Sequence, residues 1–386
     1  MTLADRYPSV ADLARKARRR LPHFAWEFLD SGTGREYALA RNEAALQRIL
    51  MRPRTMAGGL SPEIAVQLWG TEYAAPFGIA PVGMSGMIWP GSERALARAA
   101  AEARIPMCLS NFANSSIEAV GRAVGEMGWF QLYPPKDPEI REDLLIRARV
   151  NGWKVLVVTV DVPLGSMRER QRRAGARLTL SANPLFYLDM LRRPAWLLAL
   201  LREDRQRMWT IEPYVPARGA GRYIGYITGQ VERTPSWEYL AELRDLWTGP
   251  LVVKGIMNPD EAERCVAMGV DGIGVSNHGG RQFDAAPAAI DVLPAIRAAV
   301  GERAKIIFDS GLRGGLDIAR ALALGADFCL LGRAFFYALG ALGARGPDHL
   351  ITLLRDDLIN NMGQMGVDRL DGLADRLVAP PSVERE

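Results

Sequence analysis

Eight short runs of hydrophobic residues recur along the chain, and within each run the apolar character is continuous rather than alternating. They cover residues 76–82, 106–112, 129–133, 155–161, 251–256, 272–278, 305–311 and 328–334. Strands that are buried on both faces, as in a parallel sheet covered by helices, have this continuous pattern. The runs therefore predict eight buried parallel strands.

Between the runs, apolar residues recur at spacings of three and four, which indicates helices with one buried face. These segments are 91–104, 139–152, 235–247, 259–269 and 314–325, and another at 349–363 follows the last strand. Strand and helix alternating eight times predict an α/β fold, a (β/α)8 TIM barrel over about residues 76–366. A doubly wound sheet would have fewer strands and usually a glycine-rich fingerprint after the first.

Two segments fall outside this alternation, and we interpret the whole chain, residues 1–386, as one domain that contains both. Residues 1–60 predict an N-terminal helical extension, in which the basic run at 15–20 is interpreted as a solvated helix face. About residues 165–234 form a long insert between the fourth strand and its helix. Loops of this length are usually functional or disordered.

Within the insert, residues 183–209 mix Leu, Trp and Phe with Arg. The uninterrupted apolar part is too short to span a bilayer, but it suits a helix lying in a membrane interface. A lid or a subunit contact would bury the same leucines. Both interpretations stay open, with the membrane slightly favoured.

Composition narrows the classes of function. The 386 residues carry a net charge of +4 with a pI near 9.0, which suits anionic ligands or an acidic membrane surface. No basic and aromatic nucleic-acid motif occurs, so no nucleic-acid partner is expected. Cys108, Cys265 and Cys329 lie far apart without metal-ligand spacing, which predicts reduced, mostly buried thiols and no metal. Residues 1–13 lack the apolar stretch of a signal peptide, so we expect a cytoplasmic protein, in contact at most with the inner face of the membrane.

Polar residues stand where the predicted strands end. They are Ser110, Asn111, Gln131, Tyr133, Thr159, Asp161, Lys254, Ser276, Asn277, His278, Asp309 and Arg333. In a TIM barrel these positions converge on one rim, where the active sites of such enzymes lie. This convergence predicts an active site.

The stretch SNHGGRQFD, residues 276–284, carries the most specific chemistry. His278 ends a strand and suits a general base near neutral pH, and the guanidinium of Arg281 can hold a carboxylate with two hydrogen bonds. Asp161 suits the role of the carboxylate that orients the imidazole and stabilises its cation. The group predicts removal of a proton or a hydride from the carbon next to a carboxylate.

Two glycine-containing loops follow the last two strands. DSGLRGG (309–315) and LLGRA (330–334) predict a phosphate site, because barrels often bind phosphate there and Arg313 and Arg333 supply charge. The sequence has neither a Walker loop nor a well-placed G-x-G-x-x-G, which disfavours a nucleotide of the ATP or NAD type as the ligand. Lys254 suits an electron-rich cofactor ring, whose polar edge Ser110, Gln131 and Thr159 would contact; a salt bridge from Lys254 to Asp161 or Asp309 is the alternative.

These motifs, in this order, resemble the FMN-dependent 2-hydroxy-acid oxidase and dehydrogenase family, which includes glycolate oxidase, lactate dehydrogenase, flavocytochrome b2 and mandelate dehydrogenase. The resemblance runs from LPHFAWEFLDSG at residue 21 to LLGRAFFYAL at residue 330, and SNHGGRQFD is its most specific part. WFQLY, TVDVP, VVKGI and DSGLRGG support it. PVGMSGMIWPG and the apolar insert make the mandelate dehydrogenase branch the most similar.

The resemblance implies a role for each matching residue. His278 would be the catalytic base with Asp161 as its partner, Arg281 and Arg168 would clamp the substrate carboxylate, and the Tyr133 hydroxyl would bond the substrate. The residues implied to bind FMN are Pro81, Val82, Gly83, Ser110, Gln131, Thr159, Lys254, Ser276, Asp309, Gly311, Arg313, Gly332 and Arg333. Of these, Asp309 would hold the ribityl chain, and Arg313, Gly332 and Arg333 would surround the phosphate.

Phe28 departs from the family pattern, which has a tyrosine whose hydroxyl helps to hold the substrate carboxylate. Loss of one hydrogen bond to a charged group costs about 1.5–3 kcal/mol, or roughly ten- to a hundredfold in affinity. Either the remaining clamp suffices or the substrate is unusual. The base, both arginines and the flavin contacts remain, so an active enzyme is expected.

The leading hypothesis is an FMN-dependent dehydrogenase that oxidises an (S)-2-hydroxy acid, mandelate-like or lactate-like, and is reoxidised by a quinone or another carrier at the membrane. Gly83, where many oxidases of the family have Ala, and the apolar insert both favour it. An oxidase that makes hydrogen peroxide and a non-catalytic flavin scaffold are the alternatives. Met84, Met87 and Trp89 suit an apolar pocket for the 2-substituent, or equally the core. The resemblance also implies a homo-oligomer, a tetramer.

Overall fold

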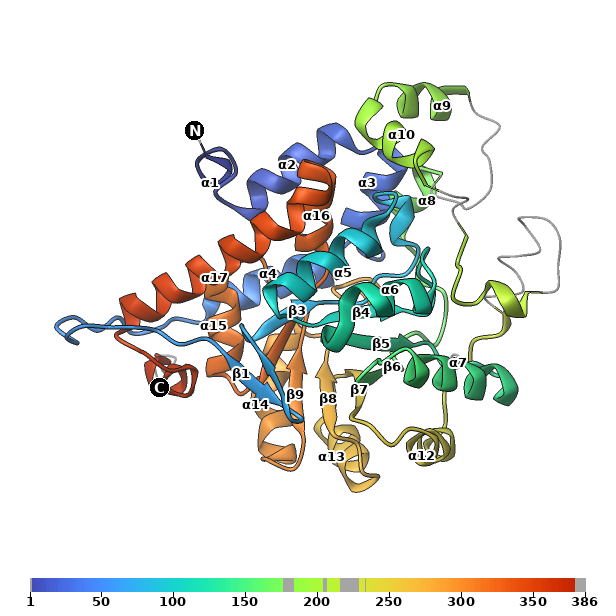
Figure 1. The fold of residues 1–386 in the computed structure, drawn as a ribbon. Coiled ribbons are helices and arrows are strands. Elements are labelled where there is room, and N and C mark those ends of the chain that lie inside the picture. Colours follow the sequence, from blue (N-terminus) through green and yellow to red (C-terminus); the bar gives the residue numbers. More distant parts are fainter. Residues whose placement is uncertain (1, 176–183, 204–206, 216–228, 233, 379–386) are drawn as a thin grey trace.

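The centre of the molecule is a closed barrel of parallel strands (Figure 1). The computed structural model describes residues 2–175, 184–203, 207–215, 229–232 and 234–378. The barrel strands are β3 (Phe77–Ile79), β4 (Met107–Ser110), β5 (Gly128–Leu132), β6 (Val155–Thr159), β7 (Leu251–Ile256), β8 (Gly272–Val275), β9 (Lys305–Phe308) and β10 (Phe328–Leu331). Each pairs with the next and β10 pairs with β3, so the predicted TIM barrel is confirmed.

Helices surround the barrel and cover the outer faces of its strands (Figure 1). They are α5 (Ser92–Ala103), α6 (Ile117–Val124), α7 (Pro138–Val150), α12 (Trp237–Leu246), α13 (Pro259–Ala267), α14 (Ala289–Val300), α15 (Gly315–Ala323), α16 (Arg333–Leu342) and α17 (Gly346–Met365). The short 3-10 turns are η1 (Ser85–Met87), η2 (Gly125–Met127), η4 (Gly343–Arg345) and η5 (Leu370–Arg376).

One helix was not predicted. The expected helix at 349–363 lies within α17, but α16 comes between it and the last strand, and the apolar run at 328–334 ends inside α16. Residues 334–341 of α16 are all buried, between the barrel and α2 (Val10–Arg20). A helix that is buried all round has no polar face, so its sequence lacks the periodicity that reveals a surface helix.

The N-terminal extension is helical as predicted up to Arg48, through α1 (Leu3–Arg6), α2, α3 (His23–Asp30) and α4 (Tyr37–Arg48). In the basic run at 15–20, Arg15, Arg18 and Arg19 are exposed, whereas Arg20 is half-buried and donates to the carbonyl of Ala341. The hairpin of β1 (Val66–Leu68) and β2 (Thr71–Tyr73) lies across the other end of the barrel. Its Trp69 ring packs 5.7 Å from Trp129, at the start of β5. This packing covers the amino-terminal end of β5.

The insert contributes α8 (Glu169–Arg173), α9 (Pro184–Leu191), α10 (Pro194–Leu201) and η3 (Glu212–Tyr214). The segment predicted as one interfacial helix is thus two, because Pro194 starts a new helix. Phe186 stacks on Phe24 of α3 at 4.9 Å, and the buried Trp196 ring meets Phe24 edge-on at 5.6 Å. Residues 176–183, 204–206 and 216–228 of the predicted insert lie outside the described residues.

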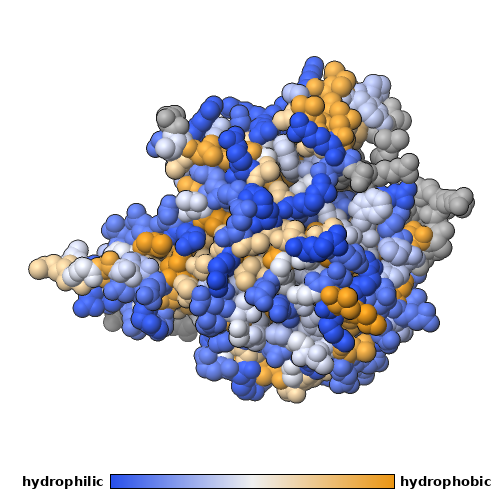
Figure 2. All heavy atoms as spheres, viewed as in Figure 1, coloured by the Kyte–Doolittle hydropathy of each residue, from blue (hydrophilic) through white to orange (hydrophobic). Residues whose placement is uncertain are grey.

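The outer face of α9 and α10 is hydrophobic. Leu188, Leu191, Leu198 and Leu201 are 41%, 64%, 52% and 73% exposed, and hydrophobic atoms gather over these two helices in Figure 2. Among the described helices none is both long enough and apolar enough to cross a membrane. The three cysteines are free and buried, as predicted.

Candidate active site

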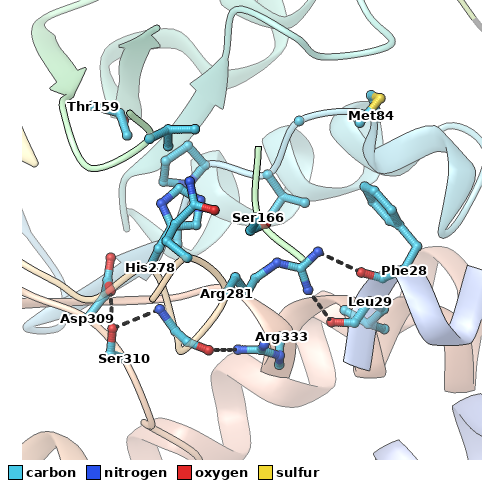
Figure 3. A pocket seen from close by; sticks show the side chains of 18 of the residues that line it. Phe28, Leu29, Met84, Thr159, Ser166, His278, Arg281, Asp309, Ser310 and Arg333 are labelled. Atoms are coloured by element: carbon cyan, nitrogen blue, oxygen red, sulfur yellow. Dashed lines mark hydrogen bonds between the residues drawn. The ribbon is translucent and has the colours of Figure 1, made fainter. Parts of the chain in front are cut away.

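A cavity of about 520 Å³ opens at the carboxyl ends of the barrel strands and is roofed by α3 and the start of the insert (Figure 3). Most of the predicted site residues line it: Phe28, Pro81, Val82, Gly83, Tyr133, Thr159, Arg168, Lys254, His278, Arg281, Asp309, Gly311, Arg313, Gly332 and Arg333. Asp161, Ser110, Gln131 and Ser276 do not line the cavity. Asp161 and Ser276 contact lining residues through the hydrogen bonds described below, and Ser110 and Gln131 are register partners in β4 and β5.

The loop after β8 places His278 beside Asp161. The imidazole Nδ1 lies 2.9 and 3.1 Å from the two Asp161 oxygens. Burial acts to raise the pKa of Asp161, but the charge and hydrogen bond of His278 outweigh it and the pKa is lowered. The carboxylate therefore stays ionised next to the imidazole, as the partner of a general base should.

The backbone of this loop is held in an uncommon conformation. His278 has a φ of 58°, and Gly279 and Gly280 follow at 63° and 71°. A Cβ on Gly280 would meet the Leu39 nitrogen at 2.5 Å, so only glycine fits there. Such strain costs about 1–3 kcal/mol for a residue with a side chain and is common at active sites.

Lys254 lies in a buried polar network. Its Nζ is 2.6 Å from Asp309 Oδ2 and donates to Ser276 Oγ at 2.8 Å, and Ser276 in turn donates to Asp309 Oδ1 at 2.6 Å. Burial acts to lower the pKa of Lys254, but Asp309 and Asp161 outweigh it and the pKa is raised. Of the two salt bridges considered from sequence, the structure has the one to Asp309.

Three partly buried arginines line the cavity, and the described residues give none of them a carboxylate partner. Arg281 donates to the carbonyls of Phe28, Leu29 and Ser31 at 2.9, 3.2 and 2.8 Å, as Figure 3 shows for Phe28 and Leu29. Arg168 donates to Ser166, and Arg333 donates to the carbonyls of Gly279 and Ser31.

The electrostatics of this group favour a bound anion. Burial, followed by the neighbouring charges of Arg168 and Arg333, lowers the pKa of Arg281 well below its ordinary value. Burial also lowers the pKa of Arg333, to about 10. Like charges that share a desolvated space without an anion repel each other, and a carboxylate or phosphate relieves that repulsion.

The loop after β9 is partly engaged already. The Arg313 N–H donates to Asp317 and the Gly315 N–H to Asp357, while the Arg313 guanidinium lies 2.8 Å from Glu43. Gly311 has a φ of 95°, and a Cβ there would sit 3.0 Å from Leu46. The backbone N–H groups of Arg313 and Gly315 are therefore already paired with carboxylates and are not open to an anion.

The residues present fit FMN. Gln131 Nε2 and Arg333 Nε are buried without a hydrogen-bond partner in the described part of the chain, and an unpaired buried donor indicates a missing acceptor. A flavin has ring carbonyls and a phosphate to supply such acceptors. Lys254, Arg313 and Arg333 line the same cavity and supply positive charge for the ring and the phosphate of that molecule.

One wall of the cavity is apolar, and sequence reasoning found only part of it. Met84 lines the cavity as expected, whereas Met87 and Trp89 belong to the core. Phe112, which stacks on Tyr133 at 5.1 Å, was missed because it follows the polar residues that drew attention to β4. Ser166, Val231 and Gln282 also line the cavity and were missed. Gln282 stands within SNHGGRQFD but was given no role, and no motif or periodicity marks the other two.

The chain is similar to known proteins over almost its whole length. The sequence model of the family described as FMN-dependent dehydrogenase matches residues 17–380. The chain belongs to this family. It is 39% identical over 353 residues to an L-lactate dehydrogenase of Xanthomonas campestris pv. campestris, which covers 91% of both chains.

Solved structures of the same family superpose closely. A monotopic membrane protein, (S)-mandelate dehydrogenase, has a TM-score of 0.90 and 34% identity, with 96% of this chain and 99% of that chain covered. A mandelate oxidase has a TM-score of 0.81 and 32% identity, with 96% and 98% covered. The protein is therefore an FMN-dependent oxidoreductase, and FMN is its cofactor.

Proposed function

We propose that the protein oxidises an (S)-2-hydroxy acid to the 2-oxo acid and delivers the electrons to a quinone or another carrier at a membrane. The observation that carries the reaction is His278, paired with Asp161, which lines one cavity with arginines that have no carboxylate partner among the described residues. Acceptance of the electron pair is the chemistry that FMN supplies. The base and the anion clamp come from the chain itself.

The substrate is held through its carboxylate. Toward the described residues, Arg281 keeps its Nε–H and one Nη2 hydrogen beyond those given to carbonyls, and Arg168 keeps its terminal Nη groups. With the carboxylate there, His278 takes the proton and Asp161 stabilises the resulting cation. Tyr133, whose pKa burial raises to about 12, remains a neutral hydroxyl that bonds the substrate.

The remaining assignments concern the cofactor. Lys254 offers a positive charge to the flavin ring, and Asp309 offers an acceptor to the ribityl chain. Ring contacts are assigned to Pro81, Val82, Gly83, Ser110, Gln131, Thr159 and Ser276, and phosphate contacts to Gly311, Arg313, Gly332 and Arg333.

We assign an apolar 2-substituent larger than a methyl group to the wall formed by Met84 and Phe112. Behind these two side chains pack Met208 and Ile211, which are buried and come from the insert. A hydrophobic pocket favours each added methylene of a ligand by about 1–3 kcal/mol when it fits. An aromatic or branched hydroxy acid should therefore be preferred over glycolate.

The membrane contact is assigned to the exposed leucines of α9 and α10. Exposed leucines on adjoining helices, with Arg192 and Arg193 between them, suit the headgroup boundary. A similar protein of known structure is a monotopic membrane protein. A homotetramer completes the proposal, and sedimentation tests it.

The proposal is tested by anaerobic reduction of the flavin with 2-hydroxy acids of increasing size. Bleaching of the oxidised flavin by the S-enantiomer, and a faster rate for mandelate than for glycolate, are the expected results. Reduced enzyme is then mixed with air or with a soluble quinone. Rapid reoxidation by quinone and slow reoxidation by air are expected.

Two other results would replace the proposal. Fast turnover with oxygen alone would make the protein an oxidase, a function that the similarity to a mandelate oxidase also allows. If no hydroxy acid bleaches the flavin, the protein would be a non-catalytic flavin-binding scaffold. The hydroxyl that Phe28 lacks would then explain the loss of turnover.

A further inference from the structure

We propose that Arg170, which does not line the cavity, positions Arg168 and thereby sets the affinity for the substrate carboxylate. This inference rests on the proposed function of Arg168 as a carboxylate clamp.

Arg168 is poorly fixed by its own contacts. It is the residue before α8, and the described chain gives its side chain one hydrogen bond, to the nearby Ser166 at 2.9 Å. The position of its side chain in the cavity therefore depends on the position of the α8 backbone. Whatever holds α8 in position also holds Arg168.

Apolar packing does not hold α8. None of its residues, Glu169 to Arg173, is buried, so the helix has no hydrophobic anchor on the barrel. A helix of this length is also unstable by itself. Polar contacts must fix it.

Arg170 supplies most of those polar contacts. Its Nε lies 2.7 Å from Glu27, its Nη2 2.8 Å from Asp30 and its Nη1 3.0 Å from Glu36. One guanidinium thus joins α8 to three carboxylates of the N-terminal segment. A backbone hydrogen bond from Gly34 to the carbonyl of Met167, at 2.9 Å, adds a further tie.

The three carboxylates are themselves fixed. Glu27 is buried, Asp30 accepts from the Tyr337 hydroxyl at 2.7 Å, and Glu36 accepts from the Gly32 N–H at 2.7 Å. Partial burial acts to lower the pKa of Arg170, but hydrogen bonds to Asp30, Glu27 and Glu36 outweigh it, and the pKa is raised. A network with several fixed partners is stronger than an isolated surface pair.

The direction of the two side chains completes the argument. Residues two apart at a helix start point to opposite sides. Arg170 therefore reaches outward to the acidic residues while Arg168 reaches into the cavity. Helix α3 carries Glu27 and Asp30, which bind Arg170, and also the carbonyls that accept hydrogen bonds from Arg281. One helix therefore positions both arginines of the clamp.

The test compares Arg170→Gln with Arg173→Gln in the FMN-loaded protein. Arg173 lies on the same helix with an exposed pair to Glu169, so its loss removes the same charge without touching the network. Readouts are the dissociation constant of oxalate, followed through the flavin spectrum, and the KM and kcat for the best hydroxy acid.

Misplacement of a binding group by about an ångström can cost up to roughly a hundredfold. We expect R170Q to weaken oxalate binding and to raise KM roughly ten- to a hundredfold, with kcat and FMN content changed less than about twofold. R173Q should resemble the wild type. Arg170→Lys should recover part of the loss, because an ammonium can reach some of the carboxylates but not all three at once.

Unchanged oxalate binding in R170Q, or an equal loss in R173Q, would overturn the inference. Loss of FMN by both R170Q and R170K would also overturn it, because Arg170 would then support the fold rather than the clamp. Oxalate binding needs no turnover. If wild-type flavin is never bleached but oxalate binds and R170Q weakens it, the proposed reaction fails while the role of Arg170 stands.

Discussion

Phe28 shows how one side chain sets the strength of the anion site. Its ring lines the cavity 5.7 Å from the guanidinium of Arg281, and it points toward Met84 in Figure 3. The ring stacks near the cation but donates no hydrogen bond. Its backbone carbonyl, by contrast, accepts one from Arg281. The position therefore keeps its structural role and lacks a side-chain donor.

Phe28→Tyr should tighten carboxylate binding. A new hydrogen bond to a charged group contributes about 1.5–3 kcal/mol, or roughly ten- to a hundredfold in the dissociation constant of oxalate. The flavin spectrum during an oxalate titration measures it. Phe112→Tyr, which adds a hydroxyl to the apolar wall instead, is the control and should not tighten binding. Equal affinities of F28Y and the wild type would show that the clamp is complete without this hydroxyl.

At the scale of elements, a helix or strand could be predicted where its burial leaves a pattern in the sequence. Strands buried on both faces and helices with one polar face left clear patterns, and so did the motifs at strand ends. Residues 334–341 left none because they are buried on every side. Arg170 gave no signal, since its partners Glu36 and Asp30 are 134 and 140 residues away. Met208 and Ile211 gave none either, because only the folded insert brings them behind Phe112.

The two helices of the insert carry their own prediction. Replacing Leu188, Leu191, Leu198 and Leu201 by Gln should release the protein from vesicles of phosphatidylethanolamine and phosphatidylglycerol. Each leucine that enters an apolar phase contributes up to about 1.5–3 kcal/mol, so binding should fall at least about tenfold. Co-sedimentation measures it, and turnover with a soluble acceptor should persist.

A matched control for this experiment lies on α7. Ile146 and Val150 are 53% and 79% exposed, and replacing both by Gln removes exposed apolar surface elsewhere. This variant should still bind vesicles. Release of both variants, or of neither, would contradict the assignment of the membrane contact to α9 and α10.

At the scale of the whole molecule, the cavity is a meeting point of distant segments. The short N-terminal stretch 27–36 contacts the insert, the loop after β8 and the start of α16. The partly buried arginines at this junction, Arg168, Arg281 and Arg333, have no counterion in the described part of the chain. Binding of FMN should therefore stabilise the fold as a unit.

Removal of FMN should lower the unfolding temperature. At a free concentration of 100 times its dissociation constant, FMN stabilises the native state by about 2.7 kcal/mol. Differential scanning calorimetry of apoprotein with and without FMN measures it. Riboflavin, which lacks the phosphate, should restore only part of the increase. Identical unfolding temperatures with FMN, with riboflavin and without either would contradict a cofactor site among these arginines.

The contacts of Ser31 and Asp30 have a consequence for biosynthesis. The Ser31 carbonyl accepts from Arg333, and Asp30 accepts from Tyr337, across sequence separations of 302 and 307 residues. A ribosome must therefore release nearly the entire polypeptide before the first helices find their final neighbours. During translation the first helices of the nascent chain therefore lack their final contacts. FMN accordingly binds after synthesis.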